Sequence, residues 1–311
     1  MASAAVLGTL QPLLMADELI SGLLKDVDVR VVLALTSELS RQARATHKSL
    51  PASAALLSQG LTAAALMGAL QKGETRINIQ LECDGPLRGF FVDGDTAGVV
   101  RGYTKNPLVA HMGAEGGYRW RPVLGNKGFI SVLRDTGSGE YYRSSVELER
   151  FDFAEDLERY FGLSDQVATQ LTLAQLPTPG NGAPEPLGIV AGVLLQPLPN
   201  GDREAFQALG AQVKARFHEV LQAHAAEGGS ALLKALLPGR TDLEVMSRYP
   251  LRFTCTCSRE RVKTALMAMG REELTDLLEK EGKAEVTCQF CTTHYVIPSE
   301  EIRELMKEAG Q

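Results

Sequence analysis

Four cysteines near the end of the chain are the residues with the clearest chemistry. Cys255 and Cys257 form a C-x-C pair, and Cys288 and Cys291 form a C-x-x-C pair after 30 intervening residues. Two short cysteine pairs brought together by a fold supply the four thiolates of a tetrahedral zinc ion. We therefore expect one zinc ion bound by these four sulfurs.

The C-x-C pair departs from an ordinary zinc ribbon, in which two or more residues separate each pair of ligands. A single intervening residue lets both sulfurs reach one metal, but it also lets them close a very small disulfide ring. Disulfides forced from their preferred geometry are easily reduced and are typical of labile or regulatory sites. The four sulfurs can thus hold a metal or leave it as disulfides, while a permanent structural zinc ribbon is the simpler alternative.

Other cysteine chemistry fits the sequence less well. A thioredoxin-like use of Cys288 and Cys291 requires a strand that runs into a helix, but the following residues, Thr-Thr-His-Tyr-Val-Ile, indicate a turn and a short strand. His294 in that stretch is an alternative ligand, although we expect it at the surface because four cysteines are present. Cys83 ends an alternating strand pattern, and we expect it to be a buried small apolar residue.

Composition excludes several classes of protein. The chain has 311 residues, 44% of them hydrophobic, which is enough for one large and one small domain. The net charge of −6 gives no electrostatic footprint for nucleic acid. No run approaches the 18 or so consecutive apolar residues of a membrane span.

The amino-terminal composition bears on the compartment. The first basic residue is Lys25, so the start of the chain lacks the charged region of a secretory signal and the arginines of a mitochondrial presequence. We therefore expect a cytoplasmic protein. Thiols stay reduced in that compartment, which favours bound metal over standing disulfides.

The elements upstream of the cysteines predict an α+β core domain over residues 1–199. Residues 51–73 carry Ala, Leu or Met on nearly every face, which predicts a buried central helix. Short turns rich in Gly, Asp and Asn separate successive strand patterns, which predicts antiparallel sheets packed around that helix. The expected strands are 28–36, 76–83, 87–93, 99–104, 129–134, 142–149, 166–173 and 187–196; two more helices are expected over 37–47 and 153–161, an irregular loop over 177–186 and a loose tail over 1–16.

Residues 200–250 predict a helical linker. Phe206, Val213 and Phe217 belong to an apolar stripe at helical spacing, which ends before a second short helix. Helices of this length are marginal alone and depend on docking of their apolar face. The pattern fits an ordinary docked hairpin, and it also fits a conditionally folded segment that hides an apolar surface.

Residues 251–311 predict a small zinc-binding domain that holds both cysteine pairs. We expect helices over 258–269 and 271–280 and a final helix that begins near Pro298. The chain contains no Walker A sequence, no G-x-G-x-x-G after a strand, no H-E-x-x-H and no nucleophile elbow. We therefore do not expect an enzyme.

Longer motifs carry a resemblance to a known family. The segments RFTCTCSRERVKTALMAMGREEL and EVTCQFCTTHYVIPSEEI resemble the carboxy-terminal redox switch of the redox-regulated heat-shock chaperones of about 33 kDa. Further segments resemble the first domain of that family, and they are LTAAALMGALQKGE, LECDGPLRGFFVD, VRGYTKNP, AEDLERYF and VAGVLLQPLP. The resemblance extends from about residue 17 to residue 305.

The resemblance implies an ATP-independent holdase that is idle while its four cysteines bind zinc. Oxidation would convert Cys255–Cys257 and Cys288–Cys291 to disulfides, expel zinc and unfold the zinc domain with the linker. The protein would then form a homodimer and capture unfolding client proteins. A constitutive zinc module that binds nucleic acid or a regulatory partner is the alternative, although the acidic balance and sparse aromatic residues argue against nucleic acid.

Overall fold

The described part of the chain divides into two units, the first ending at Phe253 and the second beginning at Thr254. The computed structural model describes residues 16–110, 120–137, 139–178 and 185–308. The expected tail over 1–16 lies almost wholly outside the described residues, and so does the middle of the loop expected over 177–186.

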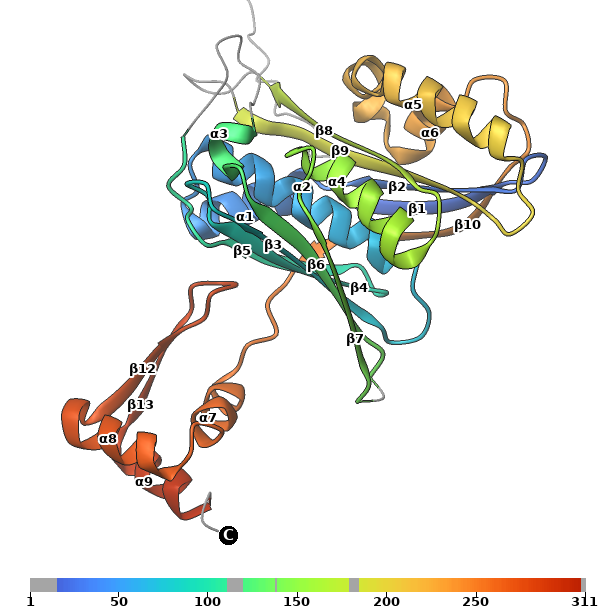
Figure 1. Ribbon diagram of the computed structural model, residues 1–311. Helices are drawn as coiled ribbons and strands as arrows, with labels where there is room; N and C mark the ends of the chain where they lie inside the picture. Colours follow the sequence, from blue (N-terminus) through green and yellow to red (C-terminus); the bar gives the residue numbers. More distant parts are fainter. Residues whose placement is uncertain (1–15, 111–119, 138, 179–184, 309–311) are drawn as a thin grey trace, which may run out of the picture. The chain divides into compact units, whose positions relative to one another are not determined.

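Helix α2 (Pro51–Gly68) is the centre of the first unit. It starts with proline at its first turn, and every one of its residues except Pro51 and Gln59 is buried. It contacts strands of two different sheets and lies between them (Figure 1). The backbone of the second sheet comes very close to α2 at Gly94, where a Cβ atom would lie 2.4 Å from the Ala64 carbonyl oxygen, so only glycine fits there. The expected buried central helix is confirmed, and it ends five residues earlier than expected.

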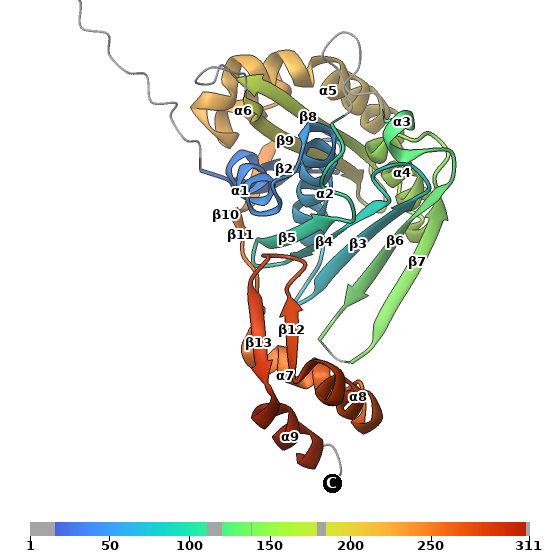
Figure 2. The ribbon, with the colours of Figure 1, turned by 90° about the vertical axis from the view of Figure 1, so that its left-hand side faces the viewer.

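The two sheets of the first unit lie on opposite sides of α2 (Figure 2), and their strands are antiparallel apart from one short pairing. The first sheet has the strand order β10-β1-β2-β9-β8, and the second has the order β11-β5-β4-β3-β6-β7, in which β11 runs parallel to β5. This α+β architecture agrees with the sequence prediction. The strands are β1 (Glu18–Leu24), β2 (Val29–Leu35), β3 (Arg76–Cys83), β4 (Gly89–Asp95), β5 (Val99–Thr104), β6 (Gly128–Asp135), β7 (Tyr141–Glu147), β8 (Gln170–Thr178), β9 (Glu185–Pro197), β10 (Leu243–Pro250) and β11 (Arg252–Phe253).

The remaining helices of the first unit include the two expected over 37–47 and 153–161 and both helices of the expected linker. Among the described helices, none combines the length and the apolar character that crossing a membrane requires. Besides α2, the first unit has the helices α1 (Ser37–His47), α3 (Arg121–Leu124), α4 (Phe153–Tyr160) with a π-helical turn (Phe161–Asp165), α5 (Arg203–His224) with a 3-10 turn (Ala225–Glu227) and α6 (Gly229–Leu236).

Three sequence predictions need correction. Strands β1 and β10 were not expected, because neither shows an alternating pattern: β1 is mostly buried on both faces, and β10 is mostly exposed. Strand β8 begins at Gln170 and not at Gln166, because the chain first completes the π-helical turn after α4. Strands β8 and β9 also continue into both ends of the expected irregular loop.

Helices α5 and α6 cover the face of the first sheet that points away from α2 (Figure 1). Phe206, Val213 and Phe217 of α5 are each 1% exposed, as the helical spacing of the apolar stripe predicts. Together with α6 they form a second hydrophobic core. Its members on the sheet include Ile20, Leu24, Val29, Val31, Leu33, Leu35, Val193 and Leu195.

Helix α1 is capped from a distance. Its own N-cap residue, Thr36, makes no side-chain cap bond, whereas the Asp17 carboxylate accepts the backbone N–H groups of Glu38 (2.9 Å) and Leu39 (2.6 Å). Burial outweighs these hydrogen bonds and raises the pKa of Asp17 from 3.8 to about 6. Because the folded-state pKa lies above the unfolded one, Asp17 stabilises the fold most at low pH, and this contribution falls as the pH rises from about 4 to 6.

We therefore expect Asp17→Ala to destabilise the protein by about 1 kcal/mol more at pH 5 than at pH 7.5, measured by urea unfolding. Asp17→Asn is the matched control, because it also lacks the titrating carboxyl. The stability difference between the two variants should not change with pH. An equal loss at pH 5 and pH 7.5 for the alanine variant would contradict the assignment.

The second unit packs three helices against a two-stranded sheet. The elements are α7 (Arg259–Met267), α8 (Arg271–Glu281), β12 (Lys283–Thr287), β13 (His294–Pro298) and α9 (Ser299–Glu308). Ser258 accepts the Arg261 N–H at 3.3 Å, which confirms it as the N-cap of α7. The buried apolar core is small, and its members are Val262, Leu266, Leu274, Ala284, Ile297, Ile302 and Leu305.

Candidate metal centre

Two loops of the second unit present the four cysteines. Cys255 and Cys257 lie in the irregular segment between β11 and α7, and Cys288 and Cys291 lie in the turn between β12 and β13. The turn is fixed by its main chain, since the Thr292 N–H donates to the Cys288 carbonyl (2.8 Å) and the Cys288 N–H donates to the Thr293 carbonyl (2.9 Å). This confirms a turn followed by a strand and gives no thioredoxin-like strand–helix junction.

The fold brings together all four predicted ligands. Their sulfur atoms lie within 4.8 Å of one another. The Cys255 and Cys288 sulfurs are 3.7 Å apart, and the Cys257 and Cys291 sulfurs are 3.3 Å apart. Four thiolates around zinc, each with a Zn–S bond of about 2.3 Å, place neighbouring sulfurs roughly 3.8 Å apart. The donor set and its spacing therefore fit a single tetrahedral metal ion.

The electrostatics of the cluster also favour a bound cation. Burial, with smaller contributions from hydrogen bonds to the neighbouring sulfurs, raises the pKa of Cys257 to about 12, although the Tyr295 hydroxyl lowers it. Burial also raises the pKa of Cys291, but hydrogen bonds from Thr293 and Cys257 outweigh it and hold this pKa at about 7. The cluster by itself thus accommodates one thiolate readily, and four thiolates this close together require a positive ion.

Two hydroxyl groups orient the sulfurs, and sequence analysis had not identified either of them. The Tyr295 hydroxyl lies 3.1 Å from the Cys257 sulfur, and the Thr293 hydroxyl lies 3.1 Å from the Cys291 sulfur. The hydrogen bond to Cys257 raises the pKa of Tyr295 to about 12, so this hydroxyl stays protonated and can donate to a Cys257 thiolate. Their position, two and four residues after Cys291, was the only available signal.

The unit has little besides the cluster to hold it together. Glu301 of α9 pairs with Arg259 (2.6 Å) and Lys263 (2.5 Å) of α7. Such partly exposed ion pairs contribute about 1 kcal/mol or less each. With a small apolar core and weak surface pairs, the folding of this unit depends strongly on whatever cross-links the four sulfurs.

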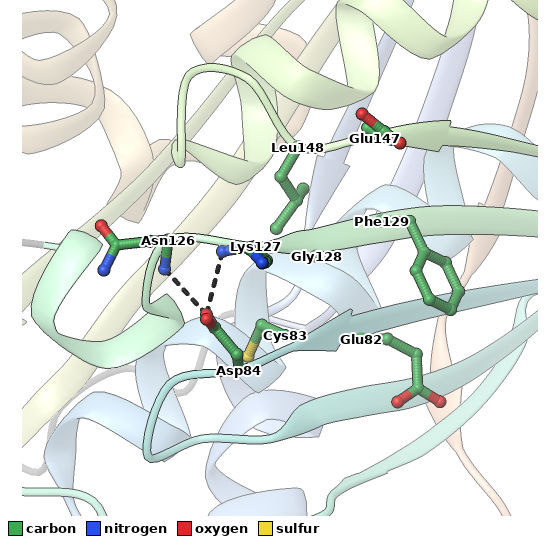
Figure 3. Close-up of a pocket in the computed structure, with 9 residues that line it drawn as sticks. All are labelled: Glu82, Cys83, Asp84, Asn126, Lys127, Gly128, Phe129, Glu147 and Leu148. Atoms are coloured by element: carbon green, nitrogen blue, oxygen red, sulfur yellow. Dashed lines mark hydrogen bonds between the residues drawn. The ribbon is translucent and has the colours of Figure 1, made fainter.

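His294 and Cys83 lie outside the metal cluster, and His294 is at the surface as expected, whereas Cys83 is only half-buried and not buried as predicted, because it lies at the end of its strand. The exposed His294 ring contacts Thr287 (3.2 Å) and, at 4.0 Å, Glu285. Cys83 is half-buried at the end of β3, where desolvation raises the pKa of its thiol to about 11 and keeps it protonated. It lines an open pocket of about 620 Å³ beside Asp84, which accepts two backbone N–H groups of the facing loop (Figure 3).

Comparison with known proteins gives a consistent result over nearly the whole chain. A family model described as Hsp33 protein matches residues 17–298. The 33 kDa chaperonin of Citrifermentans bemidjiense is 31% identical over 302 residues, which cover 96% of this chain and 99% of the relative. The 33 kDa chaperonin of a Geobacillus species is 30% identical over 300 residues, with coverages of 95% and 99%.

A solved structure agrees with these relatives. The crystal structure of the 33 kDa chaperonin (heat shock protein 33 homolog) from Thermotoga maritima aligns with a TM-score of 0.78 at 26% identity. The alignment covers 94% of this chain and 98% of that chain. These relatives carry the names of chaperonins and not of enzymes. The resemblance stated from the motifs is therefore confirmed.

Proposed function

Because this chain belongs to the Hsp33 protein family, we propose that it is a redox-regulated holdase chaperone. In the reduced state, zinc bound by Cys255, Cys257, Cys288 and Cys291 keeps residues 251–311 folded and the chaperone idle. Oxidation of the four cysteines releases zinc and unfolds this domain, together with the linker over residues 200–250. The core domain, residues 1–199, stays folded.

The observation that carries this proposal is the four-sulfur cluster, which joins two loops of a unit whose described apolar core has only seven buried residues. Structural zinc contributes on the order of 10–16 kcal/mol to the folding of a small domain. Whole domains are stable by only about 5–15 kcal/mol. A unit of this size that loses such a ligand has too little other stabilisation to stay folded.

The proposed oxidation forms Cys255–Cys257 and Cys288–Cys291. The described cluster permits several pairings, and this one follows the family resemblance. Each disulfide forms as two thiols lose two electrons and two protons, which reduce one hydrogen peroxide molecule to two water molecules.

The linker supplies the second half of the switch. Helices α5 and α6 hide the apolar outer face of the first sheet, including Val31 and Leu33. Undocking of the helices exposes both this face and the stripe of Phe206, Val213 and Phe217. Such a contiguous apolar surface is suited to unfolding client proteins, which expose apolar residues themselves. No nucleotide is needed, since thiol oxidation supplies the driving force.

The proposal has four further parts. The protein has no catalytic residues and acts in the cytoplasm, where reduced thiols retain zinc until an oxidant appears. The oxidised form is a homodimer. The protein does not bind nucleic acid, in keeping with its net charge of −6.

The alternative function is a constitutive zinc module that binds nucleic acid or a regulatory partner. It predicts binding that oxidation leaves unchanged.

We expect peroxide treatment at raised temperature to release one zinc ion per chain, remove four accessible thiols and switch on suppression of client aggregation. Zinc release and thiols are followed with colorimetric reagents in the same sample, and client aggregation is followed by light scattering. Addition of dithiothreitol and zinc should reverse all three changes. Equal protection of the client before and after oxidation, or none in either state, would refute the proposal.

A further inference from the structure

Strand β10 is paired with β1 through its main chain along its whole length, and its side chains pack on the hydrophobic cores only near its two ends, at Leu243 and Tyr249. The pairing covers all seven residues of β1, from Glu18 opposite Pro250 to Leu24 opposite Leu243. The side chains of β10 are nevertheless exposed or half-exposed, and Met246 is 64% exposed. Main-chain hydrogen bonds do not depend on the side chain, so the edge of β1 recognises an extended strand and not a particular sequence.

The register shows which amides of β10 face β1. The Leu251 N–H donates to the Asp17 carbonyl at 3.0 Å. Because alternate residues of an antiparallel strand face the partner, the Tyr249 N–H also faces β1, whereas the Arg248 N–H faces away. Pro250, which has no N–H, occupies a position that faces away, as an edge strand requires.

Strand β1, whose edge β10 covers, carries buried side chains on both faces of the sheet. Leu19 of β1 belongs to the core around α2, and Ile20 belongs to the core under α5 and α6. If β10 leaves, main-chain groups of β1 lose their partners between two apolar layers. Each group left unsatisfied there costs about 1–3 kcal/mol. A vacated β1 edge therefore favours pairing with another strand.

One carboxylate links β10 to the linker helices. Glu18, whose side chain is 13% exposed, accepts the Gly229 N–H at the start of α6 (2.9 Å) and the Arg248 side chain (2.5 Å). A Cβ on Gly229 would lie 2.8 Å from the Cδ1 atom of Ile20, so glycine permits this close approach. Undocking of α6 and release of β10 therefore weaken each other's contacts.

Strand β10 is also the chain segment that leads to the cysteines. It continues into the two-residue strand β11, and Cys255 follows two positions after Phe253. Unfolding of the second unit removes the folded structure beyond this short anchor. A strand with exposed side chains and a short anchor belongs to the part of a fold that opens most easily.

We propose that the edge of β1 is a client-binding site at which an extended segment of an unfolding protein replaces β10 by antiparallel strand addition. This inference rests on the proposed function and adds the surface and the main-chain mode of capture. Glu18 favours a client segment with a basic residue in the place of Arg248. Sequence-independent pairing suits a chaperone, since its clients share no sequence.

The test uses a dye-labelled synthetic peptide that spans residues 242–251 and the full-length protein. Two further peptides carry one backbone N-methyl group each, at Tyr249 or at Arg248. The unmodified peptide and the peptide methylated at Arg248 should bind the oxidised protein in fluorescence anisotropy and abolish its protection of a client. The peptide methylated at Tyr249 should do neither, and none should bind the reduced, zinc-loaded protein.

The outcomes separate this inference from the proposed function. If the oxidised protein protects clients but the two methylated peptides behave alike, strand addition to β1 is wrong and the chaperone function stands. If the peptides block only self-association in light scattering, the edge is an interface between two copies and the client assignment is overturned. If oxidation brings no protection at all, the proposed function fails and this inference fails with it.

Discussion

Replacing Cys288 by serine is expected to unfold residues 254–311 in the reduced protein and to make the chaperone active without oxidant. The substitution removes one of four sulfurs that lie within 4.8 Å of one another. Three remaining thiolates hold zinc far more weakly, and the stabilisation at risk is on the order of 10–16 kcal/mol. Zinc content, resistance to trypsin and suppression of client aggregation measure the three expected changes.

Cys83→Ser is the matched control for this experiment. Cys83 is half-buried in β3 and lies outside the sulfur cluster, so its substitution should leave zinc content and trypsin resistance unchanged. The metal assignment would be wrong if Cys288→Ser retained one zinc ion per chain and a trypsin-resistant second unit. Unchanged trypsin resistance in both variants would show that the four-sulfur cluster does not stabilise the unit.

The second large effect is expected from Phe217→Ala, in the face of α5 that docks on the first sheet. Phe217 is 1% exposed, and truncation of a buried Phe costs about 3–5 kcal/mol. Because helices of this length are marginal without docking, the loss should undock α5 and α6. We expect the reduced Phe217→Ala variant to suppress client aggregation while it still binds zinc, and both client aggregation and zinc content are measured in the same sample.

Ala215→Asp provides the comparison on the same helix. Ala215 is exposed on α5, so its substitution should leave the linker docked and the reduced protein idle. Limited trypsin digestion should cut the Phe217→Ala variant within α5 and α6 while the rest of the first unit stays intact. Cleavage throughout the first unit would indicate global unfolding, and an idle variant with a protease-sensitive linker would contradict the proposed client surface.

Much of the fold could be predicted because its signals are local. Residues 37–47, 76–83 and 99–104 were placed at their observed bounds by turn residues and by the length and periodicity of their patterns. The apolar stripe from Phe206 to Leu221 gave α5 in the same way. The prediction failed where a strand has no alternation of apolar and polar residues. Strand β10 is an example, because its mostly exposed side chains give it a sequence like that of an irregular linker.

The candidate site shows the same division. The four cysteines were identified from their type and spacing alone, because thiolate chemistry admits few other uses for two such pairs. Tyr295 was not identified, since its hydroxyl meets the Cys257 sulfur only through the folded turn between β12 and β13. The division of the first unit into a core and a linker remains a prediction.

By itself the sequence indicated the four candidate ligands, the metal class that four thiolates suit and the apolar faces of the helices, because these properties reside in side chains and their spacing. Only the tertiary structure decided that β10 pairs with β1, more than 200 residues earlier in the chain, and that Glu18 joins this pair to α6. Strand pairing is a contact between main chains, which every residue shares, so no local pattern of side chains records its partner.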